Sequence, residues 1–187
     1  TRTKQASAPY VLQARDNESA VTWEVDNESI GGLGATLDFQ KNEWARPGAL
    51  VALRTSREDG WKVAVLRRIN RLSEERLYAG IQVLASTPVS VTLLAEGEER
   101  MDKITVTEIG YGGQFELPDA RMAVYLPHKI DNSLVNTLIM RPADYGQSRI
   151  YQVRAHGKSF YVSIGNVLEK GSDWIWVVVN VLRQEKG

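Results

Sequence analysis

The chain alternates between short apolar runs and short polar breaks. In the first half, the runs lie at residues 10–14, 21–25, 35–39, 49–54, 61–66 and 77–84. The breaks between them contain glycine, aspartate, asparagine or proline, which are typical turn residues. Short strands at close, regular spacing are typical of antiparallel sheets that close into small barrels. The pattern therefore predicts an all-β fold.

The second half of the chain shows the same pattern. Its apolar runs lie at residues 104–109, 114–117, 122–126, 149–155, 159–164 and 174–179, and the last run is rich in aromatic and β-branched residues. Residues 134–140 fit helical as well as strand spacing, but the segment is short and ends before Pro142, so we favour a strand there. We expect a second β-barrel of similar size, although no aligned sequence repeat relates the two halves.

A charged interruption at residues 95–100 separates the halves, and we place the domain boundary there. The predicted domains are residues 1–97 and 98–187, two small antiparallel β-barrels in tandem. Residues 1–9 are polar and without periodicity, which favours a mobile arm. The charged stretch 67–76 is expected to be a loop or a short helix.

Composition limits the range of functions. The 187 residues are 43% hydrophobic and 25% charged, with zero formal net charge and no cysteine. A neutral chain gives no long-range attraction to nucleic acid or to an anionic membrane. No apolar run approaches the roughly 18 residues that span a bilayer, and the start of the chain lacks a signal-peptide segment. We therefore expect a cytoplasmic protein without membrane insertion and without nucleic acid as a partner.

The most informative stretch is residues 26–34, which read D-N-E-S-I-G-G-L-G. Asparagine and aspartate form local side-chain turns, and each glycine removes a side chain, so that a ligand can approach the backbone. Asn27 offers an amide that both donates and accepts, and Ser29 offers a hydroxyl. From the residues alone, this turn is either a plain hairpin or the site of a polar, planar ligand.

Residues 27–32 match the N-x-S-x-x-G form of a known signature, and strands at residues 61–65 and 79–84 follow it in the expected order. Over residues 1–95 the chain resembles the PilZ domains, bacterial receptors for cyclic di-GMP. The resemblance implies a PilZ-like first barrel, followed by a second β-rich domain as in some PilZ-type proteins. Carried onto this chain, it implies that Arg2, Asn27, Ser29 and Gly32 bind the dinucleotide.

PilZ domains carry an R-x-x-x-R element upstream of this signature. Only Arg2 lies at a suitable distance here, so its partner is expected to precede Thr1, with Lys4 and Arg15 as substitutes. Arg67 and Arg71 have the same spacing but follow the signature, and we interpret them as surface charges beside a strand.

The resemblance implies a receptor or effector that binds cyclic di-GMP at the arm and the turn and relays binding to a protein partner. The alternative is a PilZ-fold interaction module that does not bind nucleotide, which the incomplete arginine pair favours. A barrel that binds single-stranded nucleic acid is a third hypothesis, against which the zero net charge argues. His128 and His156 have no catalytic spacing with serine or aspartate, so we expect no enzyme, no metal site and no cofactor.

Overall fold

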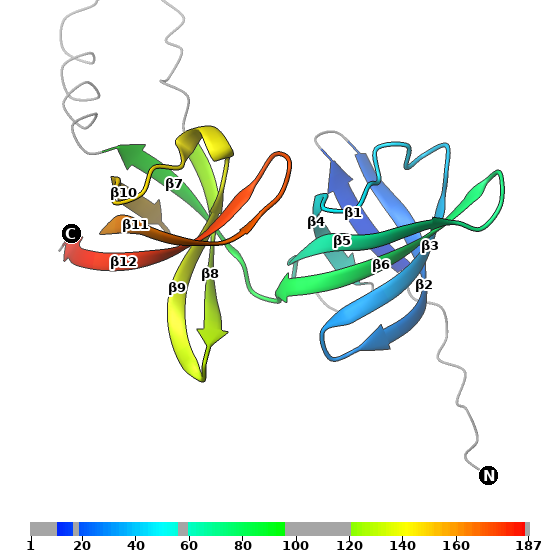
Figure 1. Ribbon diagram of the computed structural model, residues 1–187, viewed down its shortest axis with the longest axis horizontal. Helices are drawn as coiled ribbons and strands as arrows, with labels where there is room; N and C mark the ends of the chain where they lie inside the picture. Colours follow the sequence, from blue (N-terminus) through cyan, green and yellow to red (C-terminus); the bar gives the residue numbers. More distant parts are fainter. Residues whose placement is uncertain (1–10, 17–18, 56–59, 96–120, 186–187) are drawn as a thin grey trace, which may run out of the picture. The chain divides into compact units, whose positions relative to one another are not determined.

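The structure is a computed structural model that describes residues 11–16, 19–55, 60–95 and 121–185. The chain divides into two compact units, Thr1–Pro88 and Val89–Gly187. Each unit contains a closed barrel of antiparallel strands, drawn from blue to green for the first and from green to red for the second (Figure 1). The predicted all-β fold with two barrels in tandem is confirmed.

The first barrel contains six strands. They are β1 (Val11–Asp16), β2 (Ser19–Ser29), β3 (Gly32–Asp38), β4 (Leu50–Thr55), β5 (Lys62–Arg71) and β6 (Arg76–Ala85). Around the barrel they are ordered β1-β2-β3-β6-β5-β4, and β4 closes the ring by pairing with β1. Because every strand has paired neighbours on both sides, the sheet closes on itself and has no edge strand.

Strict alternation of side chains explains the two faces of this barrel. On β3, Leu33, Ala35 and Leu37 are buried in the core, and on β6, Leu77, Ala79 and Ile81 are buried opposite them. Since successive side chains on a strand point to opposite faces, the intervening residues point outward. These outward residues are Gly32, Gly34 and Thr36 on β3, and Tyr78, Gly80 and Gln82 on β6.

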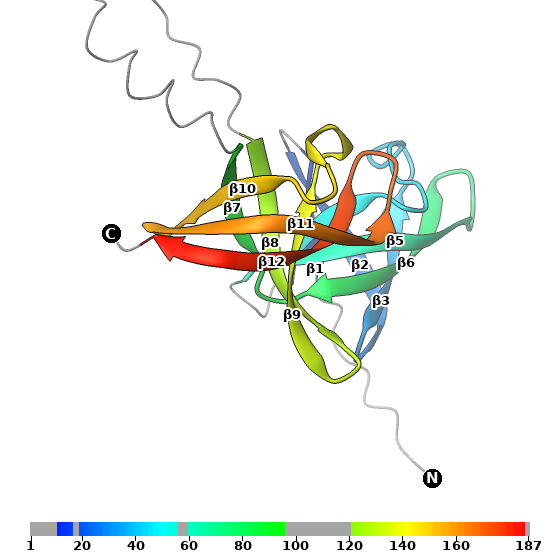
Figure 2. The same cartoon turned by 60° about the vertical axis from the view of Figure 1, so that its left-hand side comes forward.

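The second barrel repeats this arrangement. Its elements are β7 (Val89–Ala95), β8 (Arg121–Ile130), β9 (Ser133–Met140), η1 (Pro142–Asp144), β10 (Ile150–Ala155), β11 (Lys158–Lys170) and β12 (Ile175–Glu185). The order around the ring is β7-β8-β9-β12-β11-β10, which is the order of the first barrel shifted by six strands. Figure 2 shows the long pair β11 and β12, with η1 among the loops of this barrel. Segment 134–140 is a strand, as expected.

Two expectations need correction. The boundary at residues 97/98 is too late in the chain, because β7 (residues 89–95) pairs with β8 and β10 of the second barrel. The stretch 67–76 is not a loop or a helix throughout, because β5 continues to Arg71 and only a short turn separates it from β6. One face of β5 is solvated, so charged residues there do not interrupt the strand. The arm, the charged run after Ala95 and the strands expected at 104–109 and 114–117 lie outside the described residues.

Candidate functional site

A β-bulge on β2 shapes the candidate site. The pairing of β2 with β3 shifts between Val25 and Asn27, so that Asp26 is the extra residue. A bulge of this kind bends a strand and re-aims its side chains. Val25 still points into the core, whereas the carboxylate of Asp26 accepts a hydrogen bond of 2.7 Å from the hydroxyl of Thr36 on the outer face. Asn27 follows directly and is also exposed.

Two glycines form a strip without side chains beside Asn27. Gly34 on β3 pairs with Asn27 on one side and with Gly80 of β6 on the other. A Cβ atom on Gly34 would lie 2.7 Å from both polar atoms of the Asn27 amide and would also collide with the hydroxyl of Tyr78. The Asn27 amide nitrogen donates to that hydroxyl at 3.3 Å. Glycine at position 34 therefore makes room for two polar side chains to meet above the sheet.

A second bulge lies on the far side of the glycine strip. The pairing of β5 with β6 shifts between Leu66 and Arg68, which makes Arg67 the extra residue. Arg67 donates from Nε to the side-chain oxygen of outward-facing Gln82 at 2.7 Å. Arg68 pairs with Gly80, and both arginines are exposed. A continuous row therefore crosses four strands, namely Asn27, Gly34, Gly80 and Arg68.

The turn at the end of β2 carries the other signature residues. Ser29 pairs with Gly32 across the two-residue turn, and its hydroxyl donates to the Gly32 carbonyl oxygen at 3.2 Å. A Cβ atom on Gly32 would lie 2.6 Å from the backbone carbonyl oxygen of Ile81, so the strands approach too closely there for a larger residue. Ile30 at the tip is fully exposed. The predicted hairpin between the apolar runs 21–25 and 35–39 is present, but its strands are longer than expected, because β2 continues to Ser29 and β3 begins at Gly32.

The structure places three of the four predicted ligand residues together. Asn27, Ser29 and Gly32 lie on one hairpin, whereas Arg2 lies outside the described residues. The sequence analysis did not include Gly34, Gly80 or the Arg67–Arg68 pair in this surface. The sequence did contain a hint of the bulge at Arg67. Two arginines directly follow the four apolar residues 63–66, and this order does not fit the simple alternation of a strand.

Arg71 has a different role from its neighbours at 67 and 68. Its Nε donates to the backbone oxygen of Ser73 at 3.0 Å, one terminal nitrogen donates to that of Glu74 at 2.9 Å, and its guanidinium lies 4.6 Å from the ring centre of Phe39. Arg71 therefore holds the β5–β6 turn in place.

The outer face that results has a definite chemical character, and we call it the glycine platform: residues 26, 27, 29, 32, 34, 67, 68, 80 and 82. A carboxylate and an amide stand along one side, and two guanidinium groups stand along the other. Between them, Gly34 lies under the Asn27 amide and the Tyr78 hydroxyl, and Gly80 lies beside Arg68. A planar group can lie against such a surface and form hydrogen bonds at its edges. Guanidinium groups add donors suited to phosphate or to the acceptor edge of a purine.

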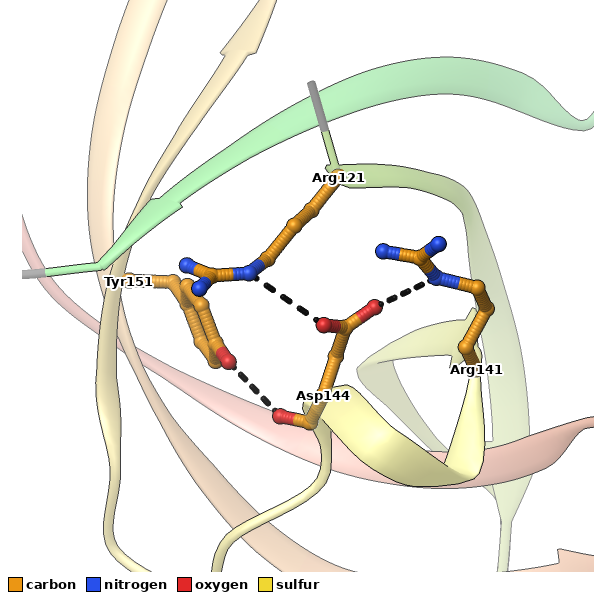
Figure 3. Close-up of polar contacts among 4 residues, drawn as sticks. All are labelled: Arg121, Arg141, Asp144 and Tyr151. Atoms are coloured by element: carbon orange, nitrogen blue, oxygen red, sulfur yellow. Dashed lines mark hydrogen bonds and ion pairs between the residues drawn. The ribbon is translucent and has the colours of Figure 1, made fainter. Parts of the chain in front are cut away.

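A different charged cluster lies in the second barrel (Figure 3). The buried carboxylate of Asp144 lies between two guanidinium groups, 3.2 Å from Arg121 Nε and 2.9 Å from Arg141 Nε. The hydroxyl of Tyr151 donates to the Asp144 backbone oxygen at 2.7 Å. These contacts join the start of β8, η1 and β10, so we interpret the cluster as a structural clamp of the barrel end.

Other site types were sought in the part of the chain that the structure describes. That part contains no group of three or more acidic or histidine side chains placed to hold a metal ion. It likewise contains no helix of the length and apolarity needed to cross a membrane. His128 lies on β8, with its ring 4.6 Å from that of Trp176, and His156 lies in the β10–β11 turn.

Comparison with protein families identifies the class of the first barrel. A family model described as the middle PilZ domain of the cyclic-di-GMP receptor FimW matches residues 1–89. These residues span the whole first unit, with its six-stranded barrel and the N-x-S-x-x-G turn. Residues 1–89 therefore form a PilZ domain. No curated protein matches the chain.

Among solved structures, the chain is similar to MrkH of K. pneumonia. The structure of the MrkH–c-di-GMP complex is 6% identical with a TM-score of 0.32, and the match covers 91% of this chain and 78% of that chain. MrkH in its apo state is 6% identical with a TM-score of 0.31, with 92% and 78% of the two chains covered. At these TM-scores the similarity carries no argument about this protein.

Proposed function

We propose that the protein is a receptor for cyclic di-GMP and that the dinucleotide binds on the glycine platform and the adjoining Ser29–Gly32 turn. The row from Asn27 through two glycines to Arg68 carries this proposal, together with the match to a receptor PilZ domain. The ligand has two phosphates and two guanines, so its surface combines negative charge with flat, polar rings. The platform offers a complementary group for each of these features.

Each residue type has a separate task in this proposal. The glycines keep the outer face of β3 and β6 low, so that a guanine can lie over these strands against the polar groups of Asn27 and Tyr78. Asn27 and Ser29 form hydrogen bonds with ligand edges. Guanidinium groups from Arg67 and Arg68 bind the O6 and N7 acceptors of guanine or a phosphate. Arg2, carried on the N-terminal arm, supplies a further guanidinium group from the other side of the ligand.

Binding, rather than chemical conversion, is the activity that these groups support. Occupation of the platform orders the arm and changes the surface that a protein partner in the bacterial cytoplasm contacts. The second candidate is a PilZ-fold interaction module without nucleotide affinity.

Titration calorimetry with cyclic di-GMP separates the two candidates. We expect Asn27→Ala and Ser29→Ala to weaken binding, each by roughly 1.5–3 kcal/mol, because each removes a hydrogen bond to a charged or buried ligand group. Ser133→Ala is the matched control, since Ser133 flanks the corresponding turn of the second barrel. Absence of binding by the unaltered protein would favour the interaction module. Unchanged affinity in both hairpin variants would move the site elsewhere.

The contribution of the arm is tested at Arg2 and Lys4. Arg2→Ala should weaken binding more than Lys4→Ala, because an ammonium group does not reproduce the planar fork of a guanidinium. Amide exchange of residues 1–9 should slow when the nucleotide binds, since ordering must offset about 1–2 kcal/mol of backbone entropy per residue. Equally fast exchange with and without bound nucleotide would show that the arm takes no part.

A further inference from the structure

The interior of the second barrel is incompletely filled at one end, where a cavity of about 430 Å³ remains. Its floor consists of buried aliphatic side chains from five strands: Val91, Leu138, Val153, Val162 and Val179. Protein interiors are normally packed with few voids larger than a water molecule. Pockets for small molecules, in contrast, occupy about 300–1,000 Å³ and have mostly apolar walls. The size and lining of this space are those of a ligand pocket.

The cavity has a structural cause in the pairing of β9 with β12. The two strands pair only from Met140 to Thr137, opposite Ile175 to Val178, and then separate. In the first barrel, the corresponding strands β3 and β6 pair over all of Gly32–Asp38. Asn136 and Val181, which lie just beyond the last pair, line the cavity from the two separated strands. The cavity is therefore open because the register of β9 and β12 leaves these strands unpaired at this end of the barrel.

Polar groups gather at the rim of the cavity and not on its floor. The hydroxyl of Tyr125 donates to the side-chain oxygen of Asn136 at 2.7 Å, and the amide nitrogen of Asn136 carries further donor hydrogens. The β10–β11 turn places His156 and Lys158 on the rim, and both side chains are exposed. An adjoining hollow is lined by the same two residues and by Arg154. Among the described residues, no aspartate or glutamate lines either space.

We propose that this cavity binds a small amphipathic carboxylate, with an aliphatic chain or ring in the barrel and the carboxylate at Lys158. The apolar floor favours burial of a hydrocarbon body, because each methylene group that leaves water stabilises the complex. The basic rim favours an anion over a neutral or cationic head group. A nucleotide does not fit this chemistry, because its polar base would face a floor without hydrogen-bonding groups. The proposal is independent of cyclic di-GMP binding by the first barrel.

Decanoate is a suitable probe, compared with decanol and decyltrimethylammonium below their micelle concentrations. Valine and leucine methyl signals of the complete chain report binding. We expect decanoate to shift signals of Val91, Val153 and Val179, with weaker binding of decanol and the weakest binding of the ammonium compound. Lys158→Gln should weaken decanoate binding about tenfold while leaving decanol binding unchanged, because only the carboxylate loses a charged partner.

Two variants and one further measurement complete the test. Ala155→Phe adds a ring at the rim and should reduce binding of all three probes, whereas Arg154→Gln, outside the cavity lining, should leave decanol binding unchanged. Unchanged methyl signals on addition of decanoate would overturn the proposal, and so would equal affinity for the anionic and cationic probes. Sedimentation showing that a second copy of the chain covers the cavity and displaces decanoate would likewise overturn it.

Discussion

The two barrels share one topology but place their polar groups differently. Their strand orders are identical, and the loop before the fourth strand is anchored by equivalent backbone hydrogen bonds: Gly48 N to Leu66 O and Leu66 N to Ala49 O in the first, Ser148 N to Ile164 O and Ile164 N to Arg149 O in the second. Such agreement without an aligned sequence repeat shows that the pattern of apolar positions and turns is enough to specify the ring.

The differences lie in what each barrel adds to this framework. In the first barrel, the buried polar contact is neutral, with the Trp23 ring nitrogen donating to Asn42 at 2.8 Å, and the outer face carries the glycine platform. The second barrel has a neutral buried contact as well, between Trp176 and Thr137, but adds an ionic one at Asp144, and its interior keeps a cavity. Strand register and side-chain size therefore give one ring a distinctive outer face in the first barrel and an interior cavity in the second.

The largest effect that we predict concerns the buried polar contacts. Asp144→Ala should destabilise the second barrel by about 3 kcal/mol, because it leaves two guanidinium groups without their shared carboxylate. The cost stays at the low end because the Arg141 side chain is 55% exposed. Asn42→Ala should cost the first barrel about 1–3 kcal/mol, since the groups that lose a partner, the Trp23 ring nitrogen and the Asp38 backbone oxygen, are neutral. Denaturant unfolding, followed by amide signals of each barrel separately, measures both. Equal costs would remove the contrast between an ionic and a neutral contact.

The next effect concerns the basic side of the glycine platform. Arg68→Ala should weaken cyclic di-GMP binding by roughly 1.5–3 kcal/mol without loss of fold, because Arg68 is exposed and lies opposite Gly80. Arg76→Ala, an exposed arginine at the start of β6, is the control. Calorimetry in low salt compares the two variants with the unaltered protein. If both variants lose affinity equally, the loss reflects the lower positive charge of the protein, and Arg68 makes no specific contact with the ligand.

A smaller effect is expected at the glycines of the first hairpin. Gly32→Ala should destabilise the first barrel by about 1–3 kcal/mol, because its new Cβ atom meets the Ile81 carbonyl oxygen and the backbone must shift. At Gly31 no atom lies within 4 Å of an added Cβ, so Gly31→Ala should have little effect. Thermal unfolding followed by barrel-specific amide signals checks the pair. If Gly32→Ala leaves the stability of the first barrel unchanged, then β3 and β6 can move apart at this position, and their close pairing is not required.

The last comparison concerns the two buried indoles, and the smallest effect that we predict is at Trp176. Trp23→Phe should cost about 1–3 kcal/mol, because it leaves the buried oxygen of Asn42 without its donor. Trp176→Phe should cost less, about 0.5–1.5 kcal/mol for the lost hydrogen bond, because Thr137 keeps its hydrogen bond to the Leu126 carbonyl. Urea unfolding of both variants compares them, and a larger cost at position 176 would contradict this reading.

The local pattern of apolar and polar residues was sufficient to predict much of the fold and part of the candidate site. Alternating apolar residues predicted most strands of both barrels, and the N-x-S-x-x-G turn was predicted as a hairpin. The row from Asn27 to Arg68 was not predicted, because it depends on the register of four strands and on two bulges. Register is set by pairing between distant segments, which a scan along the chain does not reveal.

The domain boundary was misplaced for a related reason. Residues 95–100 carry the strongest charge run between the halves, whereas the junction near Pro88 is short and has no such charge run. A charged insertion within a barrel and a linker between barrels have similar composition. Only the pairing of β7 with β8 and β10 distinguishes them.

Ring closure also limits how a protein partner can recognise these barrels. Many recognition modules add a strand of the partner to an exposed sheet edge. In the described part of the chain, every strand has paired neighbours on both sides, so over most of each barrel a partner contacts side chains on the faces or the turns. Short stretches extend beyond these pairings and pair on one side only, and examples among the described residues are 25–29 of β2, 67–71 of β5 and 133–136 of β9. Strand addition, if a partner uses it, is therefore limited to such stretches.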